Sequence, residues 1–355
     1  MKDIRDYSLL HHNTFGIAAR CRRFLEIESD EEARRLPSLL GKTDHPLLII
    51  GGGSNLLLTG DYNGTVLHSS IRGIEPADGD GDTVLLRVGS GETWDEVVQL
   101  CVDHGWHGAE NLSLIPGEVG ASAVQNIGAY GAEASHIIYN IEAVEITTGK
   151  TVTIAPTDCG YGYRQSRFKT EWHGRYLITH VTYRLHKTFT PLLDYGNIRD
   201  VLRQRSTANG QWSMVNGQCP TVNAHQLRQA IIDIRREKLP DPSVEGNAGS
   251  FFMNPMVSHE KFEELLREYP DIPHYDVAGD ASGPCRIKIP AGWLIERCGW
   301  KGRTMGHAGV HSRQALVLVN RGGATGSEIV ALCKAIQSDV KEKFGIEIQP
   351  EVNIV

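Results

Sequence analysis

The chain has 355 residues, of which 40% are hydrophobic and 22% are charged, a profile typical of a soluble globular protein with two or three domains. Its net charge of −7 argues against a nucleic-acid-binding protein, because neutralising phosphates requires concentrated Lys and Arg. The N-terminus has no apolar signal segment and the longest apolar runs are too short to span a bilayer, so we expect a cytoplasmic protein.

Short strands and glycine-rich turns are predicted in the first half of the chain. A buried strand at 46–50 runs into the turn "GGGSN" at 51–55, and a second strand covers 83–91. A hairpin is predicted over 141–156, turning at Thr148 and the glycine that follows it.

Three helices are predicted from apolar residues at helical spacing. The first begins after Thr93, with Glu96 at the capping-box position, and the second ends before Pro240. The third begins after Thr325, with Glu328 at the capping-box position. Their apolar faces and final glycines are Trp94, Val97, Val98, Cys101 and Gly105; Leu227, Ala230, Ile231 and Ile234; and Ile329, Leu332, Ile336, Val340 and Gly345.

The C-terminal segment 346–355 alternates apolar and polar residues, which predicts a strand with Glu351 on its polar face. Mixed strands and helices without a steady βαβ rhythm indicate an α+β protein. The apolar face of this strand comprises Ile346, Ile348, Val352 and Ile354. Loops are predicted at 76–82, 203–211, 239–247 and 276–284, which are rich in Gly, Pro, Ser or Asp.

Several catalytic and cofactor motifs are absent from the sequence. Neither "GKT" segment is a phosphate loop, since Leu36 and Val144 stand where the first glycine is needed. Leu56 replaces the last glycine of a dinucleotide fingerprint, and no G-x-S-x-G surrounds Ser54 or Ser250. No clustered Cys and His are present, so we expect no metal, and the seven scattered cysteines are typical of reduced, packed thiols.

Two segments rich in small residues nevertheless predict a ligand held by backbone. Successive N–H groups in the turn at 51–55 can form an anion-binding nest, where glycine lets a pyrophosphate approach closely. The segment 113–133 offers a second surface of this kind, although each segment taken alone is more often a tight turn than a cofactor site. Together they favour a large dinucleotide.

Seven motifs follow one another along the chain: "HNTFGIAA", "GGGSNLLL", "LIPGEVGASAVQNIGAYGAE", "GYRQSRF", "KLPDPSVEGNAGSFFMNP", "AGWLIERCGWKG" and "PEV". In this order they resemble the UDP-N-acetylenolpyruvoylglucosamine reductase family, from residue 12 to the C-terminus. The resemblance implies an FAD-binding fold of the vanillyl-alcohol-oxidase (PCMH) type and a separate substrate-binding domain. The implied FAD-binding subdomains are 1–72 with 340–355, and 73–238, and the implied substrate-binding domain is 239–339. The PCMH-type region covers about 17–187, and a substrate loop lies near 190–200.

The resemblance also implies a reaction in two halves, with NADPH as co-substrate and non-covalent FAD. NADPH reduces FAD, and the flavin N5 then gives a hydride to C3 of the enolpyruvyl group of the substrate. Ser250 is implied as the proton donor to C2, and such a transfer from a weakly acidic hydroxyl is favourable toward a basic enolate carbon. Arg164 and Glu351 are implied to hold and polarise the substrate carboxylate. From composition alone, Ser250 would be a loop residue and the other two surface residues.

Further contacts follow from the same resemblance. The cofactor-binding residues are Gly51, Gly52, Gly53, Ser54, Asn55, Pro116, Gly117, Gly120, Ala121, Ser122, Gln125, Asn126 and Gly128. The substrate-binding residues are Tyr195, which marks the subclass with a tyrosine loop, Lys238, Asn254, Tyr163 and Tyr130. Small molecules are thus the expected partners, with neither nucleic acid nor membrane, and we expect a monomer.

Two positions depart from what the resemblance leads us to expect. Met253 stands where many members have lysine before Asn-Pro, and Glu118 puts a carboxylate beside a pyrophosphate loop, which is unfavourable unless it points away. Two alternatives remain open, a related flavoprotein oxidase acting on another small alcohol or sugar, and a flavin-binding module without turnover.

Overall fold

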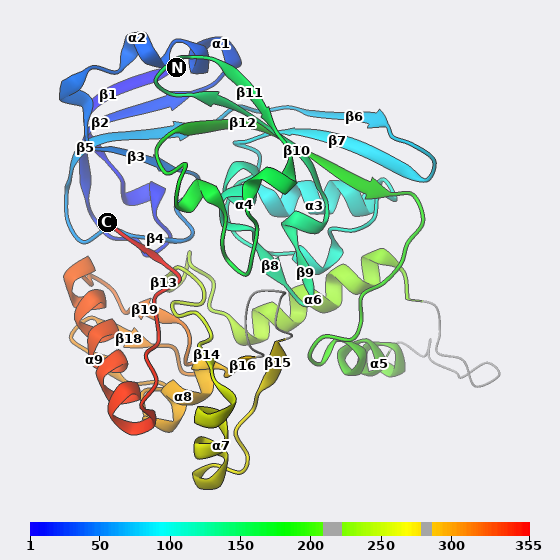
Figure 1. Cartoon of the computed structure of the whole chain (residues 1–355), viewed down its shortest axis with the longest axis vertical. Coiled ribbons are helices and arrows are strands. Elements are labelled where there is room, and N and C mark those ends of the chain that lie inside the picture. Colours follow the sequence, from blue (N-terminus) through cyan, green and yellow to red (C-terminus); the bar gives the residue numbers. More distant parts are fainter. Residues whose placement is uncertain (209–221, 278–285) are drawn as a thin grey trace. The chain divides into compact units, whose positions relative to one another are not determined.

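Two compact units make up the computed structural model (Figure 1). The residues that it describes are 1–208, 222–277 and 286–355. The first unit comprises Met1–Tyr7, Cys21–Gly52 and Asn63–Glu237, and the second comprises Ser8–Arg20, Gly53–Tyr62 and Lys238–Val355. Each unit mixes helices and strands, so the predicted α+β class is confirmed.

The first unit is built on two sheets. A four-stranded sheet has the order β1-β2-β5-β3, in which β3 and β5 are parallel, and an antiparallel five-stranded sheet has the order β11-β10-β12-β7-β6. The strands are β1 (Lys2–Ser8), β2 (Arg20–Ile27), β3 (Leu47–Ile50), β5 (Tyr62–Ser69), β6 (Ile74–Asp78), β7 (Thr83–Gly89), β10 (Ile138–Glu145), β11 (Thr151–Ile154) and β12 (Tyr176–His186).

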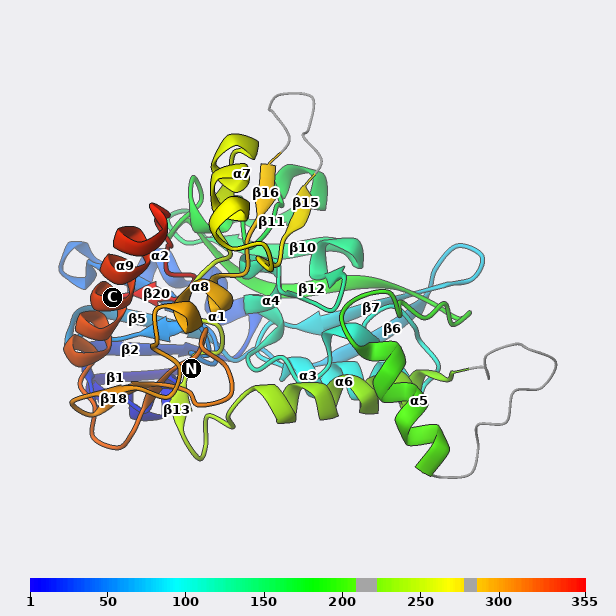
Figure 2. The same cartoon turned by 90° about the horizontal axis from the view of Figure 1, so that it is seen from below.

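Helices α3 (Trp94–Asp103) and α4 (Val119–Gln125) pack on one face of the five-stranded sheet (Figure 1). Helix α6 (Ala224–Lys238) lies beside α3 (Figure 2), where Arg228 Nη1 is 2.7 Å from Asp95 Oδ1. The remaining elements of this unit are α1 (Asp30–Arg34), α2 (Leu36–Leu39), α5 (Ile198–Ala208) and the short hairpin of β8 (Gly128–Ala129) and β9 (Ala132–Glu133).

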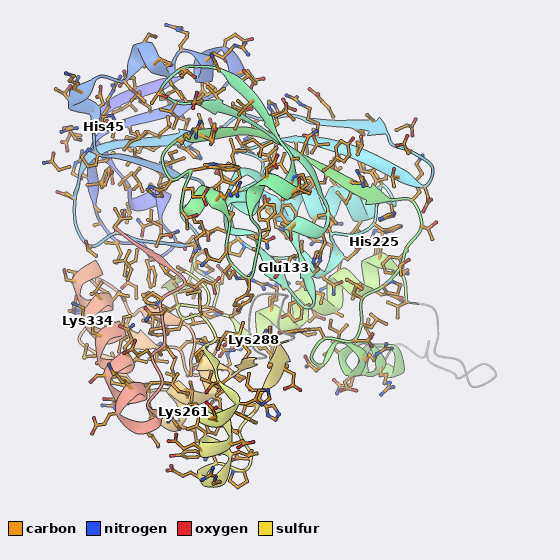
Figure 3. All side chains as sticks on the ribbon, in the orientation of Figure 1. His45, Glu133, His225, Lys261, Lys288 and Lys334 are labelled. Atoms are coloured by element: carbon orange, nitrogen blue, oxygen red, sulfur yellow. The ribbon has the colours of Figure 1, made fainter. Side chains whose placement is uncertain are left out.

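The second unit has smaller sheets. Their orders are β13-β19-β18-β17, β14-β16-β15 and the parallel pair β20-β4. The elements are β4 (Leu56–Leu57), β13 (Gly246–Asn247), β14 (Met256–Val257), β15 (Tyr275–Val277), β16 (Arg286–Lys288), β17 (Thr304–Met305), β18 (Ala308–Val310), β19 (Leu318–Asn320), β20 (Asn353–Ile354), α7 (His259–Glu268), α8 (Ala291–Arg297) and α9 (Gly326–Phe344). Figure 3 labels Lys261 on α7 and Lys288 on β16. No helix in the described ranges is long and apolar enough to cross a membrane.

Most predicted elements are confirmed, with their apolar faces buried. The strands at 46–50 and 83–91, the hairpin over 141–156 and the three helices are all present. Gly149 has the positive φ, +71°, that the hairpin turn requires.

Four boundary predictions were wrong in part, because tertiary contacts extend the neighbouring elements. Residues 76–78 of one predicted loop pair with β7 as part of β6, and residues 203–208 of another belong to α5. In the last predicted loop, residues 276–277 pair in β15, while residues 209–211 and 278–284 lie outside the described residues. The loop at 239–247 is irregular until β13 begins at Gly246.

The C-terminal segment is not one continuous strand. Only Asn353–Ile354 pairs as β20, preceded by an isolated bridge between Pro350 and Phe252. Ile346, Ile348 and Val352 are buried as predicted, but Ile354 is 42% exposed at the strand end. Glu351 is partly exposed and lies between the bridge and β20.

The capping box formed by Thr325 and Glu328 at the start of α9 should stabilise the folded protein measurably. The Thr325 side chain accepts from the Glu328 N–H at 3.2 Å, and Glu328 Oε2 accepts from the Thr325 N–H at 2.8 Å. We expect Thr325→Ala to lower the free energy of unfolding by about 1 kcal/mol in urea denaturation, because a helix N–H loses its acceptor. The matched control is Thr190→Ala, at an exposed position outside the helices and strands. Equal effects of the two substitutions would contradict the prediction.

Candidate active site

Arg164 lies at the corner of a tight turn in the first unit. Gly162 and Gln165 pair through both backbone hydrogen bonds, and Arg164 has a φ of +56°, a conformation that costs a non-glycine residue energy. Its guanidinium is anchored, since Nη2 donates to the Gly128 carbonyl at 2.6 Å and Nη1 to the Asn126 carbonyl at 3.4 Å. The arginine predicted from the sequence is thus a fixed cation and not a free surface residue.

Asn126 shapes the loop that holds Arg164. It is buried in the left-handed conformation (φ +43°), and its Nδ2 donates to Glu133 Oε2 at 2.8 Å and to the Gly162 carbonyl at 3.0 Å. Glu133, labelled in Figure 3, ends β9. Because its side chain is fully engaged, Asn126 contributes through the position it gives to neighbouring backbone.

Three predicted substrate tyrosines lie in the same unit as Arg164. The Tyr163 ring is 5.5 Å from the Arg164 guanidinium, and the rings of Tyr130 and Tyr195 form an edge-to-face pair at 6.3 Å. Tyr195 is 47% exposed on the segment before α5. Burial raises the pKa of Tyr130, and the charge of Arg235 opposes this rise.

Arg235 is a residue that sequence reasoning missed. It lies on α6, and its Nε donates to the Leu114 carbonyl at 3.2 Å. Burial, as the largest effect, lowers its pKa below the ordinary value, although the guanidinium remains a cation. The signal is the basic run "RREK" just before "LPDP", which contains Arg235 as well as the predicted Lys238.

Ser250 and Glu351 lie on adjacent backbone segments of the second unit. The Glu351 N–H donates to the Phe251 carbonyl at 2.8 Å, and the Phe251 N–H donates to the Leu316 carbonyl at 2.7 Å. Phe251 is completely buried, so the residue before it is held by a rigid neighbour. Gly249, just before Ser250, has a φ of +69° and no atom within 4 Å of where a Cβ would stand, so the backbone beside Ser250 is open at Gly249.

The glycine turn connects to the Glu351 segment within the second unit. Asn55 Nδ2 donates to the Glu351 carbonyl at 3.3 Å, and the Asn55 carbonyl accepts from the Asn353 N–H at 3.1 Å. Gly53 is required here, because a Cβ would stand 1.9 Å from the His12 carbonyl oxygen. Two predicted cofactor residues, Gly53 and Asn55, therefore hold the turn and the last strand together.

The other predicted substrate and neighbouring residues of this unit differ in their surroundings. Asn254 Oδ1 accepts from the Ala291 N–H at 2.9 Å at the start of α8, which fixes the orientation of its side chain. Lys238 is exposed at the end of α6. The Met253 backbone N–H donates to the Gln349 carbonyl at 2.9 Å.

The small residues of α4 and of the glycine turn allow close backbone contact in the first unit. A Cβ on Gly51 would be 3.3 Å from Ala121 Cβ, one on Gly52 would be 3.6 Å from Gly117 Cα, and one on Gly120 would be 3.0 Å from Ser90 Cβ. Pro116 and Gly117 lie just before α4. The segments "GGGSN" and "PGEVGAS" thus approach each other as the dinucleotide prediction requires.

Two polar residues of α4 behave differently toward a flavin dinucleotide. Ser122 Oγ donates to the Val119 carbonyl at 2.7 Å and lies 2.7 Å from the Tyr183 hydroxyl, so its side chain is engaged in the core. Gln125 Oε1, in contrast, is a buried acceptor without a donor among the described residues. An orphaned acceptor on the helix whose Ala121 contacts the glycine turn fits a ligand that brings its own donors, such as the N–H or hydroxyl groups of FAD.

The departure noted at Glu118 is explained by a histidine that sequence reasoning missed. His68 Nε2 lies 3.1 Å from both carboxylate oxygens of Glu118, and His68 Nδ1 lies 3.3 Å from Glu26 Oε2. The carboxylate points toward a basic partner and not into open space. The signal was a histidine inside the apolar run of β5, fifty residues before Glu118.

No group of three or more His, Cys, Asp and Glu side chains in the described part of the chain could hold a metal ion.

Two family descriptions match the chain. "FAD binding domain" covers residues 22–155, and "UDP-N-acetylenolpyruvoylglucosamine reductase, C-terminal domain" covers residues 241–355.

Relatives match over almost the whole chain. It is 51% identical to the UDP-N-acetylenolpyruvoylglucosamine reductase of Bacteroides fragilis over 349 residues, 98% of this chain and 99% of that protein. It is 47% identical to the protein of the same name from Paraburkholderia xenovorans, over 97% of this chain and 95% of that protein. The solved structure of the reductase from Thermus caldophilus aligns with a TM-score of 0.65 at 20% identity, over 99% of this chain and 98% of that one, which shows a shared fold.

Proposed function

The chain belongs to the UDP-N-acetylenolpyruvoylglucosamine reductase family, and we propose that Ser250, Arg164 and Glu351 carry its reaction. That reaction is the FAD-dependent reduction of enolpyruvyl-UDP-N-acetylglucosamine to UDP-N-acetylmuramate, a step of peptidoglycan synthesis. The observation that best supports the assignment of residues is the backbone hydrogen bond between Phe251 and Glu351, which places the segments of Ser250 and Glu351 side by side.

Ser250 is suited to protonate carbon on one face only. Its neighbour Phe251 is fixed by two backbone hydrogen bonds, and Gly249 leaves open space beside it. A small hydroxyl in this position holds its proton at C2 of the substrate from a single direction, which gives a product of one configuration.

Arg164 and Glu351 act on the substrate carboxylate in this proposal. The Arg164 guanidinium is already oriented by the Gly128 and Asn126 carbonyls, so it stabilises developing negative charge without reorganising. Asn55 and Phe251 fix the backbone of Glu351 in the same way. The guanidinium of Arg164 and the backbone of Glu351 are therefore held before the substrate arrives.

FAD would be held by the close-packed segments 51–55 and 116–128, with Gln125 Oε1 accepting from one of its donors. When bound, it supplies the transfer of a hydride from NADPH, the co-substrate that we propose, to the substrate. Ser122 would contribute packing only, since its hydroxyl is engaged by Val119 and Tyr183.

Tyr195, Lys238 and Asn254 are proposed contacts of the substrate diphosphate, with Tyr163 and Tyr130 nearby in the first unit. We expect Tyr195→Phe to raise KM about fivefold with little change in kcat, because one hydrogen bond to the bound substrate is lost. Steady-state kinetics would measure this. Tyr139→Phe is the control, because Tyr139 is 40% exposed and packs against Arg184. An unchanged KM for Tyr195→Phe would remove this tyrosine from the substrate site.

The two half-reactions test the proposed function. The purified protein should show flavin absorbance that NADPH bleaches without oxygen, and that enolpyruvyl-UDP-N-acetylglucosamine restores. A related oxidase would show the same bands, yet the enolpyruvyl substrate would not restore them. A flavin-binding module would show no turnover with either compound.

Three finer assignments belong to this proposal as well. We propose that the protein acts as a monomer, because one chain supplies both regions that the family descriptions match, and that it acts in the cytoplasm. We also propose that 1–72 with 340–355 and 73–238 form the two FAD-binding subdomains, and that 239–339 forms the substrate-binding domain. Size-exclusion chromatography with light scattering would test the monomer.

A further inference from the structure

A cluster of four charged or titratable groups lies beside Gly51 and Gly52 in the first unit, where His68, Glu26 and Glu118 are mostly buried and Lys2 is exposed. His68 on β5 is 8% exposed and stands between the carboxylates of Glu118 and Glu26, at 3.1 Å and 3.3 Å. Lys2 on β1 completes the cluster through its ion pair with Glu26 Oε1. The ring of Phe24 packs near the imidazole, with centroids 6.2 Å apart.

The charge of this cluster depends on one proton. With His68 protonated, two cations balance two carboxylates, whereas neutral His68 leaves the cluster with one net negative charge. Burial alone would lower the pKa of His68, but the hydrogen bonds and charges of Glu118 and Glu26 outweigh burial and raise it above the ordinary value. The proton is therefore retained to a higher pH than in an exposed histidine and is lost as pH rises through this raised pKa.

The negatively charged carboxylate of Glu118 lies next to the turn where an anionic ligand would bind. Its Oε2 is 3.2 Å, and its Oε1 3.8 Å, from the positions where a Cβ would stand on Gly51 and on Gly52. A carboxylate at this place repels a diphosphate unless a nearby cation compensates it. His68 is the cation in contact with it.

We propose that Glu118 and His68 together set the affinity of the glycine turn for FAD, which binds tightly only while His68 carries its proton. The inference rests on the proposed function, because it takes FAD as the ligand of this turn. It makes Glu118 a residue that weakens cofactor binding once His68 has lost its proton, and protonated His68 the group that cancels this effect. The diphosphate of FAD is anionic throughout the pH range concerned, so the change comes from the protein.

The test is FAD affinity of the full-length chain, measured by quenching of flavin fluorescence from about pH 6 to about pH 8.5. For the unchanged chain we expect the Kd to increase about tenfold across this range. Glu118→Gln removes the carboxylate and keeps its shape, so we expect a Kd about tenfold lower than that of the unchanged chain at the upper pH, with the difference shrinking toward pH 6.

A second histidine–glutamate pair provides the control. His107 Nδ1 lies 2.8 Å from Glu110 Oε1 in the first unit, with both side chains largely buried. Glu110→Gln is the same chemical change away from the turn, and we expect it to leave the pH dependence of the Kd unaltered. His68→Gln should weaken binding at all pH values, and Glu118→Gln should restore affinity when it is added to His68→Gln.

Three results separate the possible failures. The same pH dependence in the unchanged chain and in Glu118→Gln would overturn the inference, while FAD binding itself would still support the proposed function. Weaker binding by Glu118→Gln at the upper pH would also overturn it, because the carboxylate would then attract the cofactor. Failure of the unchanged chain to bind FAD at any pH would overturn the proposed function as well.

Discussion

Ser250→Ala is expected to leave the reduction of bound flavin by NADPH nearly normal while slowing its reoxidation by enolpyruvyl-UDP-N-acetylglucosamine about a thousandfold. The asymmetry arises because a proton to C2 is needed only in the second half-reaction, and a positioned proton donor contributes on the order of 10²–10⁴ in rate. Alanine fits because it is serine without the hydroxyl oxygen, and the backbone hydrogen bonds of Phe251 keep the neighbouring segment in place. Anaerobic stopped-flow absorbance measures both halves separately.

Ser312→Ala is the matched control for this experiment. Ser312 is exposed in the same unit, so the same substitution there should change neither half-reaction. Equal slowing of both halves in Ser250→Ala would indicate a defect of folding or of cofactor binding. That outcome would exclude Ser250 as the specific proton donor.

Replacing Arg164 should have the second largest effect. We expect Arg164→Lys to lower kcat/KM by about a hundredfold, because an ammonium cannot keep two carbonyl anchors and also present a planar fork to a carboxylate. The arginine makes those anchors at the Gly128 and Asn126 carbonyls, from a backbone conformation that is costly for any residue but glycine. Steady-state kinetics with varied substrate would measure the loss.

Arg167→Lys tests whether this loss belongs to the site. Arg167 lies three residues further on, packs against Trp172 and donates to the Asp158 carbonyl at 3.0 Å. We expect its replacement to leave kcat/KM unchanged. Comparable losses in the two variants would mean that the segment is merely sensitive to substitution.

Patterns of neighbouring residues were enough to predict the helices and the hairpin that depend on short-range interactions. Apolar spacing identified α3, α6 and α9, and the hairpin of β10 and β11 followed from its turn glycine. The two capping-box patterns show the limit of this reasoning. Thr325 forms its box, but Thr93 makes no side-chain capping bond and instead bridges to Glu118 through its backbone. The spacing is the same, and a tertiary contact decides the outcome.

The candidate site could be predicted only where a resemblance supplied it. Ser250 and Glu351 are a hundred residues apart, and composition alone would have left the serine in a loop. Their proximity depends on backbone hydrogen bonds between distant segments, which no local pattern encodes. His68 and Glu118 pair across fifty residues for the same reason, so a histidine in an apolar strand gave no sign of its partner.

The most direct test of the central assignment is the fate of the proton at C2. The NADPH-reduced protein would be mixed with enolpyruvyl-UDP-N-acetylglucosamine in heavy water, and the product examined by NMR and mass spectrometry. We predict UDP-N-acetylmuramate with deuterium at C2 in a single configuration, and no such product on the same timescale from Ser250→Ala. Deuterium at C2 in both configurations, or equally fast product formation by Ser250→Ala, would contradict the assignment of Ser250 as the proton donor.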